Sequence, residues 1–224
     1  MSEFRQSTKD GFTIEDGVLK KYTGEEKNIV IPNSVKEIAG GALYGLEAES
    51  IIISEGVKKI GKRAVYACHD LKILVLPNSV SYMESEAVFN CQTLEMVNIP
   101  TGLERIESRS FEACRSLKSI FIPGNIKSIG DYAFVNCDLL SQVSLAYGVE
   151  TIGEMVFYNC NVRKIYLPSS IKEVGKNFNN FLAGIFYAIK ICDPGSYIQQ
   201  ALEQNFISHV LTYEPVKKKS RFCK

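Results

Sequence analysis

A short segment recurs along the chain at a nearly fixed interval, and this repetition constrains the fold more than any other feature. An apolar residue followed by proline, or by a small residue in its place, occurs seven times, at successive steps of 22, 23, 23, 23, 23 and 22 residues. The apolar residues are Ile31, Ile53, Leu76, Ile99, Ile122, Leu145 and Leu167. A period of this length indicates a solenoid, in which each repeat packs only against its neighbours. Such a fold presents a long surface rather than an enclosed cleft, which favours binding over chemistry.

Each repeat begins with apolar residues at alternate positions, which is the pattern of a short, half-buried strand. The first apolar column is Ile29, Ile51, Leu74, Val97, Ile120, Val143 and Ile165. The second column lies two residues later, immediately before the proline position. Proline ends the strand because it cannot donate a hydrogen bond to a neighbouring strand.

The second half of each repeat has a further apolar pair, then a small residue beside a large one, then cysteine. Glycine follows the apolar pair at Gly61, Gly130, Gly153 and Gly175, which indicates either a positive φ or a close approach of two backbones. The small-and-large pair, as in Ala133 and Phe134, predicts one helical or 3₁₀ turn on the outer side of the coil.

Five of the seven cysteines occupy one column, at Cys68, Cys91, Cys114, Cys137 and Cys160. Neighbouring coils lie about 4.8 Å apart, so bridges between them are conceivable. Equivalent side chains in a stack point the same way, however, and the column has an odd number of members. We therefore expect a ladder of buried free thiols that act as small apolar residues. Free thiols fit a reducing cytosol or an anaerobic setting.

The columns together resemble the BspA-like, or Treponema-type, leucine-rich-repeat family. The segment "LKSIFIPGNIKSIGDYAFVNC" (residues 117–137) follows the family pattern at almost every position, and the resemblance covers about residues 29–182. It implies an α/β repeat solenoid, a right-handed leucine-rich-repeat coil that is mostly β with short helical or 3₁₀ turns outside. It also implies a bacterial protein, often surface-exposed and adhesive to host extracellular proteins.

The two ends of the chain depart from the repeat and predict caps. Asp16 and Gly17 between alternating residues predict a hairpin with strands near 12–14 and 18–22. Near the other end, "IKICDPGSYIQQALEQN" predicts a strand, a turn and a helix capped by Ser196, with Tyr197, Ala201 and Leu202 facing the last coil. The predicted domains are a hairpin cap (1–28), a solenoid of about seven repeats (29–187), a strand–helix cap (188–215) and a basic tail (216–224).

Composition excludes several classes of function. The chain of 224 residues has 26 Lys and Arg against 25 Asp and Glu, a net charge of +1, so it has no overall field that would attract nucleic acid or an acidic membrane. No apolar run reaches the ~18 residues that a membrane span needs. The polar start "MSEFRQSTKDGF" lacks the apolar core of a signal peptide. We therefore expect a cytoplasmic protein, or a secreted or cell-surface one if a signal has been removed.

Residues that could carry chemistry are explained by the repeat. The segment "GVKKIGKR" (56–63) has the glycine spacing of a phosphate-binding loop, but Arg63 replaces the hydroxyl residue that would hold magnesium. Cys68 and His69 could be imagined as a nucleophile and base, yet adjacent side chains rarely point the same way. Zinc needs three or four converging ligands, and the cysteines stand in a line. We predict no catalytic residues, no metal site and no cofactor.

The outward-facing positions of the repeated strand are the predicted binding surface. Residues between the two apolar columns point away from the core and stripe the open, concave face of the main sheet. The predicted protein-binding residues are Val30, Ile52, Ile73, Val75, Met96, Asn98, Phe121 and Tyr166. Contiguous exposed apolar residues of this kind mark interaction sites; the alternative is that β-branched and aromatic residues simply suit strands.

The sequence thus predicts a non-catalytic protein–protein interaction module, acting in bacterial adhesion or as a scaffold. The partner is a host extracellular or an intracellular protein, and no small-molecule substrate is expected. One alternative is a structural repeat protein that self-associates, so a homo-oligomer is possible. Nucleic-acid binding through the tail, with Lys217, Lys218, Lys219, Arg221 and Lys224, is a less favoured alternative to a solvated tail. Cys223 lies in this tail, outside any lipidation motif.

Overall fold

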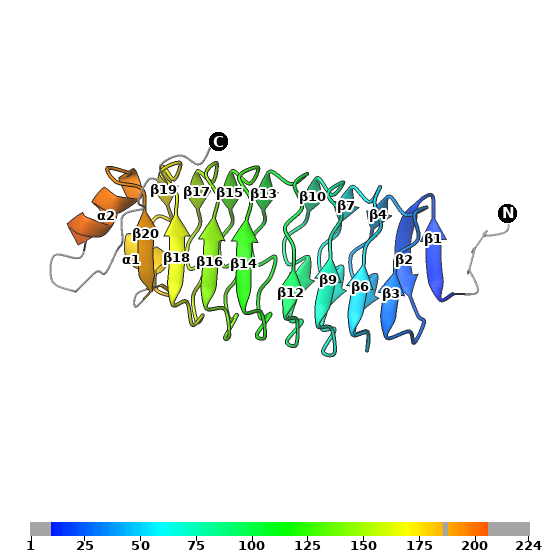
Figure 1. The fold of residues 1–224 in the computed structure, drawn as a ribbon. Helices are drawn as coiled ribbons and strands as arrows, with labels where there is room; N and C mark the ends of the chain where they lie inside the picture. Colours follow the sequence, from blue (N-terminus) through cyan, green and yellow to red (C-terminus); the bar gives the residue numbers. More distant parts are fainter. Residues whose placement is uncertain (1–9, 186–187, 206–224) are drawn as a thin grey trace, which may run out of the picture.

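The protein is an elongated stack of about seven coils, seen in a computed structural model that describes residues 10–185 and 188–205 (Figure 1). Each coil contributes one strand to a main sheet, one shorter strand to a second sheet, and a short strand or turn to a third side. Among the described residues, no helix has the length and apolar character needed to cross a membrane.

The main sheet consists of two parts of four strands each, and within each part the strands are parallel and in register. The first contains β3 (Asn28–Val30), β6 (Ser50–Ile52), β9 (Ile73–Val75) and β12 (Met96–Val97). The second contains β14 (Ser119–Ile122), β16 (Gln142–Leu145), β18 (Lys164–Leu167) and β20 (Ile189–Cys192). These strands are the predicted ones, because alternation sets one face toward the core in every coil.

The second sheet is also divided. Its first part is β1 (Phe12–Glu15), β2 (Val18–Tyr22), β4 (Glu37–Ile38), β7 (Lys59–Ile60) and β10 (Tyr82–Met83). Its second part is β13 (Arg105–Ile106), β15 (Ser128–Ile129), β17 (Thr151–Ile152) and β19 (Glu173–Val174). The glycine after these strands serves close approach at Gly130 and Gly153: a Cβ on Gly130 would lie 2.6 Å from the Ser108 nitrogen, and one on Gly153 would lie 2.6 Å from the Asp131 nitrogen. At Gly175 it serves a positive φ, of 47°.

The third side differs from the prediction of helical or 3₁₀ turns. It has the short strands β5 (Leu43–Tyr44), β8 (Val65–Tyr66) and β11 (Val88–Phe89), followed by hydrogen-bonded turns in the next three coils. In each of these six coils, two residues on the third side have left-handed φ, for example Arg109 and Ala113, both at 59°. Left-handed residues interrupt a right-handed helix, so the fold is mostly β rather than α/β. Within the described residues, a helix occupies this side in the seventh coil alone, where α1 spans Phe178–Leu182.

The core is continuous through the stack and contains the predicted thiol ladder. All the described cysteines are free, and those of the ladder are buried except Cys160, which is half-buried. Each ladder thiol donates to a carbonyl of the preceding coil; Cys137 Sγ, for instance, lies 3.3 Å from the Phe111 oxygen. Beside the thiols, Phe111, Phe134 and Phe157 stack with ring centroids 5.3 and 5.8 Å apart.

The two ends are closed by different elements. β1 and β2 form the predicted antiparallel hairpin with Asp16 and Gly17 at its tip, and β2 pairs with β4 of the second sheet. At the other end, α2 (Tyr197–Asn205) follows β20, and the Gln199 nitrogen donates to Ser196 Oγ at 3.3 Å. The helix buries Ile198 and Leu202, whereas Tyr197, predicted to face the last coil, is exposed. The whole segment after α2, residues 206–224, lies outside the described residues, and the predicted tail belongs to it.

The sequence did not predict a break that interrupts both sheets near the fourth coil. No strand pairing joins β12 to β14 or β10 to β13 among the described residues, and the wider spacing is visible in Figure 1. The third side stays continuous, because the Val88 nitrogen donates to the Ser110 oxygen at 2.9 Å and the Ser116 nitrogen to the Gln92 oxygen at 3.0 Å.

Side-chain amides hold the fourth coil at this break. Asn98 Oδ1 accepts from the Leu76 nitrogen at 2.8 Å, and Asn98 Nδ2 donates to the Leu76 oxygen at 2.7 Å. On the other side, Asn125 Nδ2 donates to the Pro100 oxygen at 3.2 Å. These bonds satisfy backbone groups that the sheet leaves unpaired.

Candidate interaction surface

The outward-facing residues of the main sheet form the candidate site. Every predicted binding residue lies on this face, on the strands or one residue beyond them. The exposed large apolar side chains here include Met96 at 62%, Phe121 at 59% and Val30 at 57% relative exposure. Binding by these side chains stays a prediction, but their arrangement can be described coil by coil.

The first four coils bring five of the predicted residues together. Val30, Ile52 and Val75 pair in register across β3, β6 and β9, and Ile73 pairs with Met96 across β9 and β12. Directly paired residues on one face have Cβ atoms about 4.5–5.5 Å apart, so these side chains form one contiguous apolar surface. We call these five residues the apolar patch.

Phe121 lies beyond the break, in register with Ser144 and Tyr166 across β14, β16 and β18. A cavity of about 320 Å³ on these strands is lined by Phe121, Tyr166 and Lys164 among others. The Tyr166 hydroxyl donates to Asp193 Oδ1 at 3.1 Å. Burial and the negative charge of Asp193 together raise the pKa of Tyr166 above its ordinary value. Tyr166 is half-buried and held by this bond, so it is less available to a partner than Phe121.

Between the two groups lies a groove of about 560 Å³ that follows the break in the sheet. Met96 and Asn98 line one side and Phe121 the other, and a Glu95–Lys118 ion pair of 2.6 Å crosses it. The lysine contact lowers the pKa of Glu95, which keeps the carboxylate charged. Asn98 is exposed, but its amide is already occupied by Leu76. In the structure, Asn98 therefore connects the fourth coil to the third.

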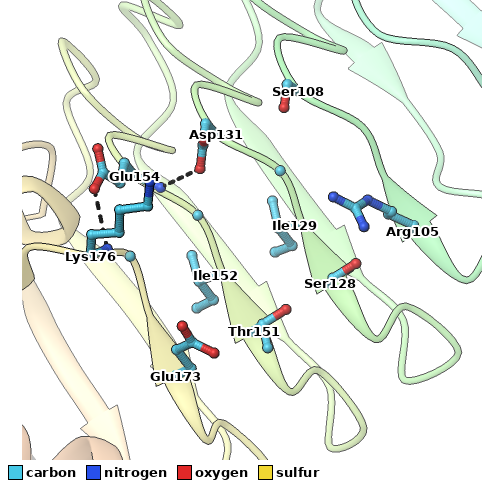
Figure 2. Close-up of a pocket in the computed structure, with 13 residues that line it drawn as sticks. Arg105, Ser108, Ser128, Ile129, Asp131, Thr151, Ile152, Glu154, Glu173 and Lys176 are labelled. Carbon is cyan, nitrogen blue, oxygen red and sulfur yellow. Dashed lines mark hydrogen bonds between the residues drawn. The ribbon is translucent and has the colours of Figure 1, made fainter.

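A second, polar pocket of about 320 Å³ lies on the second sheet (Figure 2), and sequence reasoning missed it. Arg105, Ser128, Thr151 and Glu173 line it, in register across β13 to β19. Its other carboxylates already bind backbone: Asp131 Oδ1 accepts from the Glu154 nitrogen at 2.8 Å, and Glu154 Oε1 accepts from the Lys176 nitrogen at 3.2 Å. The acidic residues therefore join neighbouring coils, and the signal that could have revealed them was a polar residue after the repeat glycine.

The other chemistry-bearing residues do not converge. Cys68 is buried with its thiol 3.0 Å from the Leu43 oxygen, whereas His69 is exposed. A hydrogen bond with Cys91 lowers the pKa of Cys68, but no described histidine lies beside this buried thiol to act as its base. In the middle of the ladder, burial raises the pKa of the Cys114 thiol to about 12, which disfavours the thiolate that a nucleophile needs. Across the part of the chain that the structure describes, no cluster of His, Cys, Asp and Glu is arranged to hold a metal ion.

Comparison with known proteins agrees with this architecture. Residues 13–139 and 67–183 match the family described as the BspA type leucine-rich repeat region, in six copies. The chain belongs to the BspA-type leucine-rich-repeat family. Members of this family are repeat proteins that generally serve as protein-interaction modules.

Two solved structures are similar in fold. A leucine-rich repeat protein from Bacteroides ovatus is 28% identical with a TM-score of 0.54, and the match covers 70% of this chain and 48% of that one. The chain thus spans about half the length of the Bacteroides protein. The leucine-rich repeat protein TpLRR of T. pallidum is 22% identical with a TM-score of 0.69, over 88% of this chain and 91% of that one. Among curated proteins, no match was found.

Proposed function

We propose that this BspA-type repeat protein is a non-catalytic module that binds another protein through the open face of its main sheet. The observation that carries the proposal is the apolar patch, five side chains from consecutive coils that point away from the core with no described element over them. Exposed contiguous apolar surface is uncommon on soluble proteins and marks interaction sites. Phe121, across the groove, extends the surface.

The stacked fold suits this role. Parallel strands fix the spacing of the exposed side chains, so a partner meets a rigid surface and little order has to be gained on binding. The charges around the patch are balanced by ion pairs such as Glu95–Lys118 and Glu49–Lys72, which favours an apolar partner surface over a strongly charged one. We place the protein in the cytoplasm as a scaffold, with bacterial adhesion at the cell surface as the alternative.

Affinity capture tests the proposal. The immobilised chain is exposed in parallel to lysate of its native cells and to host matrix proteins, alongside the variant Val75→Asp/Phe121→Asp. Leu139→Asp is the matched control, because Leu139 is also exposed and apolar but lies outside the strands of the main sheet. The circular dichroism spectrum of each variant should equal that of the wild type.

We expect a protein retained by the wild type and by Leu139→Asp and lost by the double variant. The source of that protein, lysate or matrix, distinguishes a scaffold from an adhesin. Equal retention by all three chains would remove the main-sheet face as the binding surface.

A further inference from the structure

The main sheet has an open edge at its N-terminal end. The hairpin extends the second sheet through β2 and β4, and it does not pair with the main sheet. Within residues 10–185 and 188–205, β3 therefore has a neighbour on one side only. An open edge of this kind is a template for an added strand.

The ladder geometry identifies the backbone groups at this edge. In the next coil, the Ser50 nitrogen donates back to the Lys27 oxygen at 3.1 Å, and the Ile52 oxygen accepts from the Ile31 nitrogen at 2.9 Å. Ser50 and Ile52 are in register with Asn28 and Val30. By the same alternation, Asn28 and Val30 direct their N–H and C=O groups toward the open edge, where no described backbone meets them.

The groove beside this edge is acidic. A cavity of about 410 Å³ is lined by Asn28 and Val30 and by three carboxylates, Asp10, Glu25 and Glu26, with no lysine or arginine in the lining. None of the three carboxylates has an ion-pair partner among the described residues. The groove therefore suits an extended segment that carries positive charge.

The chain itself contains such a segment at its other end. Residues 216–224 read "VKKKSRFCK", with five basic residues and no acidic one. α2 ends at Asn205, at the end of the stack opposite the hairpin (Figure 1). The last described residue before the tail thus lies at the end of the stack that lacks the acidic groove.

Chain length favours the groove of another copy over the chain's own. Lys217 lies 12 residues after Asn205, a span of at most ~42 Å when fully extended. Strands β3 and β20 are the first and last of the main sheet. Seven spacings of about 4.8 Å would separate them by ~34 Å, and the wider spacing at the break between β12 and β14 adds to this distance (Figure 1). A tail folded back on its own stack would be nearly taut, which has a large entropic cost.

We propose that the basic tail of a second copy adds to the edge of β3 as a short strand, with its lysines paired to Glu25 and Glu26. Backbone hydrogen bonds to Asn28 and Val30 provide the register, and charge selects the tail. The contact is heterologous, since one end of each copy meets the other end of the next. Such a contact builds open head-to-tail chains rather than closed dimers. The contact lies at the edge of β3 rather than on the open face, and Val30, which belongs to the apolar patch, provides its backbone here. The proposal therefore goes beyond the proposed function, which rests on the side chains of the patch.

Charge exchange between two full-length variants tests the proposal. All chains carry Cys223→Ser, which excludes disulfide-linked species. One variant is Glu25→Lys/Glu26→Lys and the other is Lys217→Glu/Lys218→Glu/Lys219→Glu, and mass is followed by sedimentation velocity across protein concentration at low and high salt. Screening at high ionic strength should weaken the contact.

At low salt, we expect the mass of the parent assembly to increase with protein concentration and each variant alone to stay monomeric. In an equal mixture of the two variants, the mass should increase with concentration again. The mixture recovers because each reversed tail then meets a reversed groove. A parent chain that is monomeric throughout, or growth that neither variant changes, would overturn the proposal. If the mass increases with concentration only after residues 1–9 are removed, those residues occupy the groove in the intact chain, and the proposal is overturned for that chain.

A peptide locates the contact. The peptide of residues 214–224 with serine at 223 is titrated into the tail-reversed variant, and amide hydrogen exchange is followed. We expect exchange at Asn28 and Val30 to slow about tenfold or more, and no slowing with the same peptide carrying glutamate at positions 217, 218 and 219. Slowing elsewhere, with Asn28 and Val30 unchanged, would exclude strand addition at this edge.

Discussion

At the scale of single residues, the third side of each coil contains left-handed φ angles, which are unfavourable for any residue that has a Cβ atom. The first coil places glycine at both left-handed positions, Gly41 with φ of 70° and Gly45 with φ of 66°. The second coil places Arg63 and Ala67 at the corresponding positions, with φ of 54° and 53°. Because a left-handed non-glycine residue costs about 1–2 kcal/mol, the repeat tolerates strain that glycine would relieve.

This difference predicts opposite effects of two matched substitutions. Gly45→Ala should lower the free energy of unfolding by about 1 kcal/mol through backbone strain alone, since a Cβ at Gly45 would meet no atom within 4 Å. Ala67→Gly should raise it by up to ~1 kcal/mol, reduced by the greater entropy of glycine in the unfolded chain. Urea unfolding followed by circular dichroism measures both. Equal signs would mean that contacts, not φ, decide these positions.

The thiol ladder gives a second residue-scale prediction. Cys114 is fully buried in the apolar core, and Cys114→Asp would place a carboxylate there, which should destabilise the protein by ~4 kcal/mol or more. Cys114→Ala keeps the site apolar and should cost far less. Phe121→Asp, on the exposed face, should leave the unfolding midpoint within about 0.5 kcal/mol of wild type. If Phe121→Asp unfolds the protein as readily as Cys114→Asp, the assigned strand faces are wrong.

At the scale of elements, the sequence predicts what depends on burial and misses what depends on backbone conformation. Apolar alternation located the main strands, and equal spacing predicted the thiol ladder, because both follow from which face is buried. The same reasoning gave a helical turn at Ala133–Phe134, since burial of a small and a large residue does not report φ. It also assigned Tyr197 rather than Ile198 to the buried face of α2, because a short helix allows two nearby choices of face.

The candidate site was predictable to the same extent. The outward position shared by Val75 and Phe121 could be assigned from alternation. The groove that separates Phe121 from the apolar patch could not. Asn98 was read as one more outward residue. Its amide instead takes the place of a backbone partner of Leu76, which depends on how the third and fourth coils pack and leaves no mark in the apolar pattern.

Strand β20 carries a lysine where the preceding strand has a core isoleucine. Lys190 pairs with Ile165, is buried, and its Nζ donates to the Ala188 oxygen at 3.0 Å. Burial lowers the pKa of Lys190 to about 8. Below pH 8 the folded protein holds the buried lysine in its charged form. Between pH 8 and ~10.4 the lysine is neutral in the folded protein but still protonated in the unfolded chain, so the free energy of unfolding rises with pH over this range.

Lys190→Met should therefore stabilise the protein at pH 7 by about 1–3 kcal/mol, since a pKa unit corresponds to about 1.4 kcal/mol. The gain should shrink as pH rises from 8 toward 10. Lys164→Met, at an exposed position of β18, is the control and should show no such trend. Melting temperatures of the three chains at pH 7, 9 and 10 provide the measurement. A gain from Lys190→Met that is constant with pH would mean that packing, not ionisation, is the cause.

At the scale of the whole molecule, stability in a solenoid is approximately a sum of repeat and neighbour terms, so a weak junction matters more than an average one. The fourth coil joins its neighbours by the third side, by Asn98 and Asn125, and by the ion pair of Glu95 and Lys118. Its main strand β12 pairs with the coils before it, and β13 pairs with the coils after it. The break therefore runs obliquely through one coil and leaves both halves attached along one continuous edge.

Hydrogen exchange should reveal this junction as the place where the stack opens. In other coils, the amide that precedes the main strand is bonded to the preceding coil; the Glu95 nitrogen donates to the Lys72 oxygen at 2.9 Å, and the Ser141 nitrogen to the Lys118 oxygen at 3.0 Å. The equivalent amide of Lys118 has no such bond among the described residues. We expect Lys118 to exchange at least about a hundredfold faster than Glu95 and Ser141, which corresponds to ~2.7 kcal/mol of local opening. Equal protection at all three amides would show that the two halves open together as one cooperative unit.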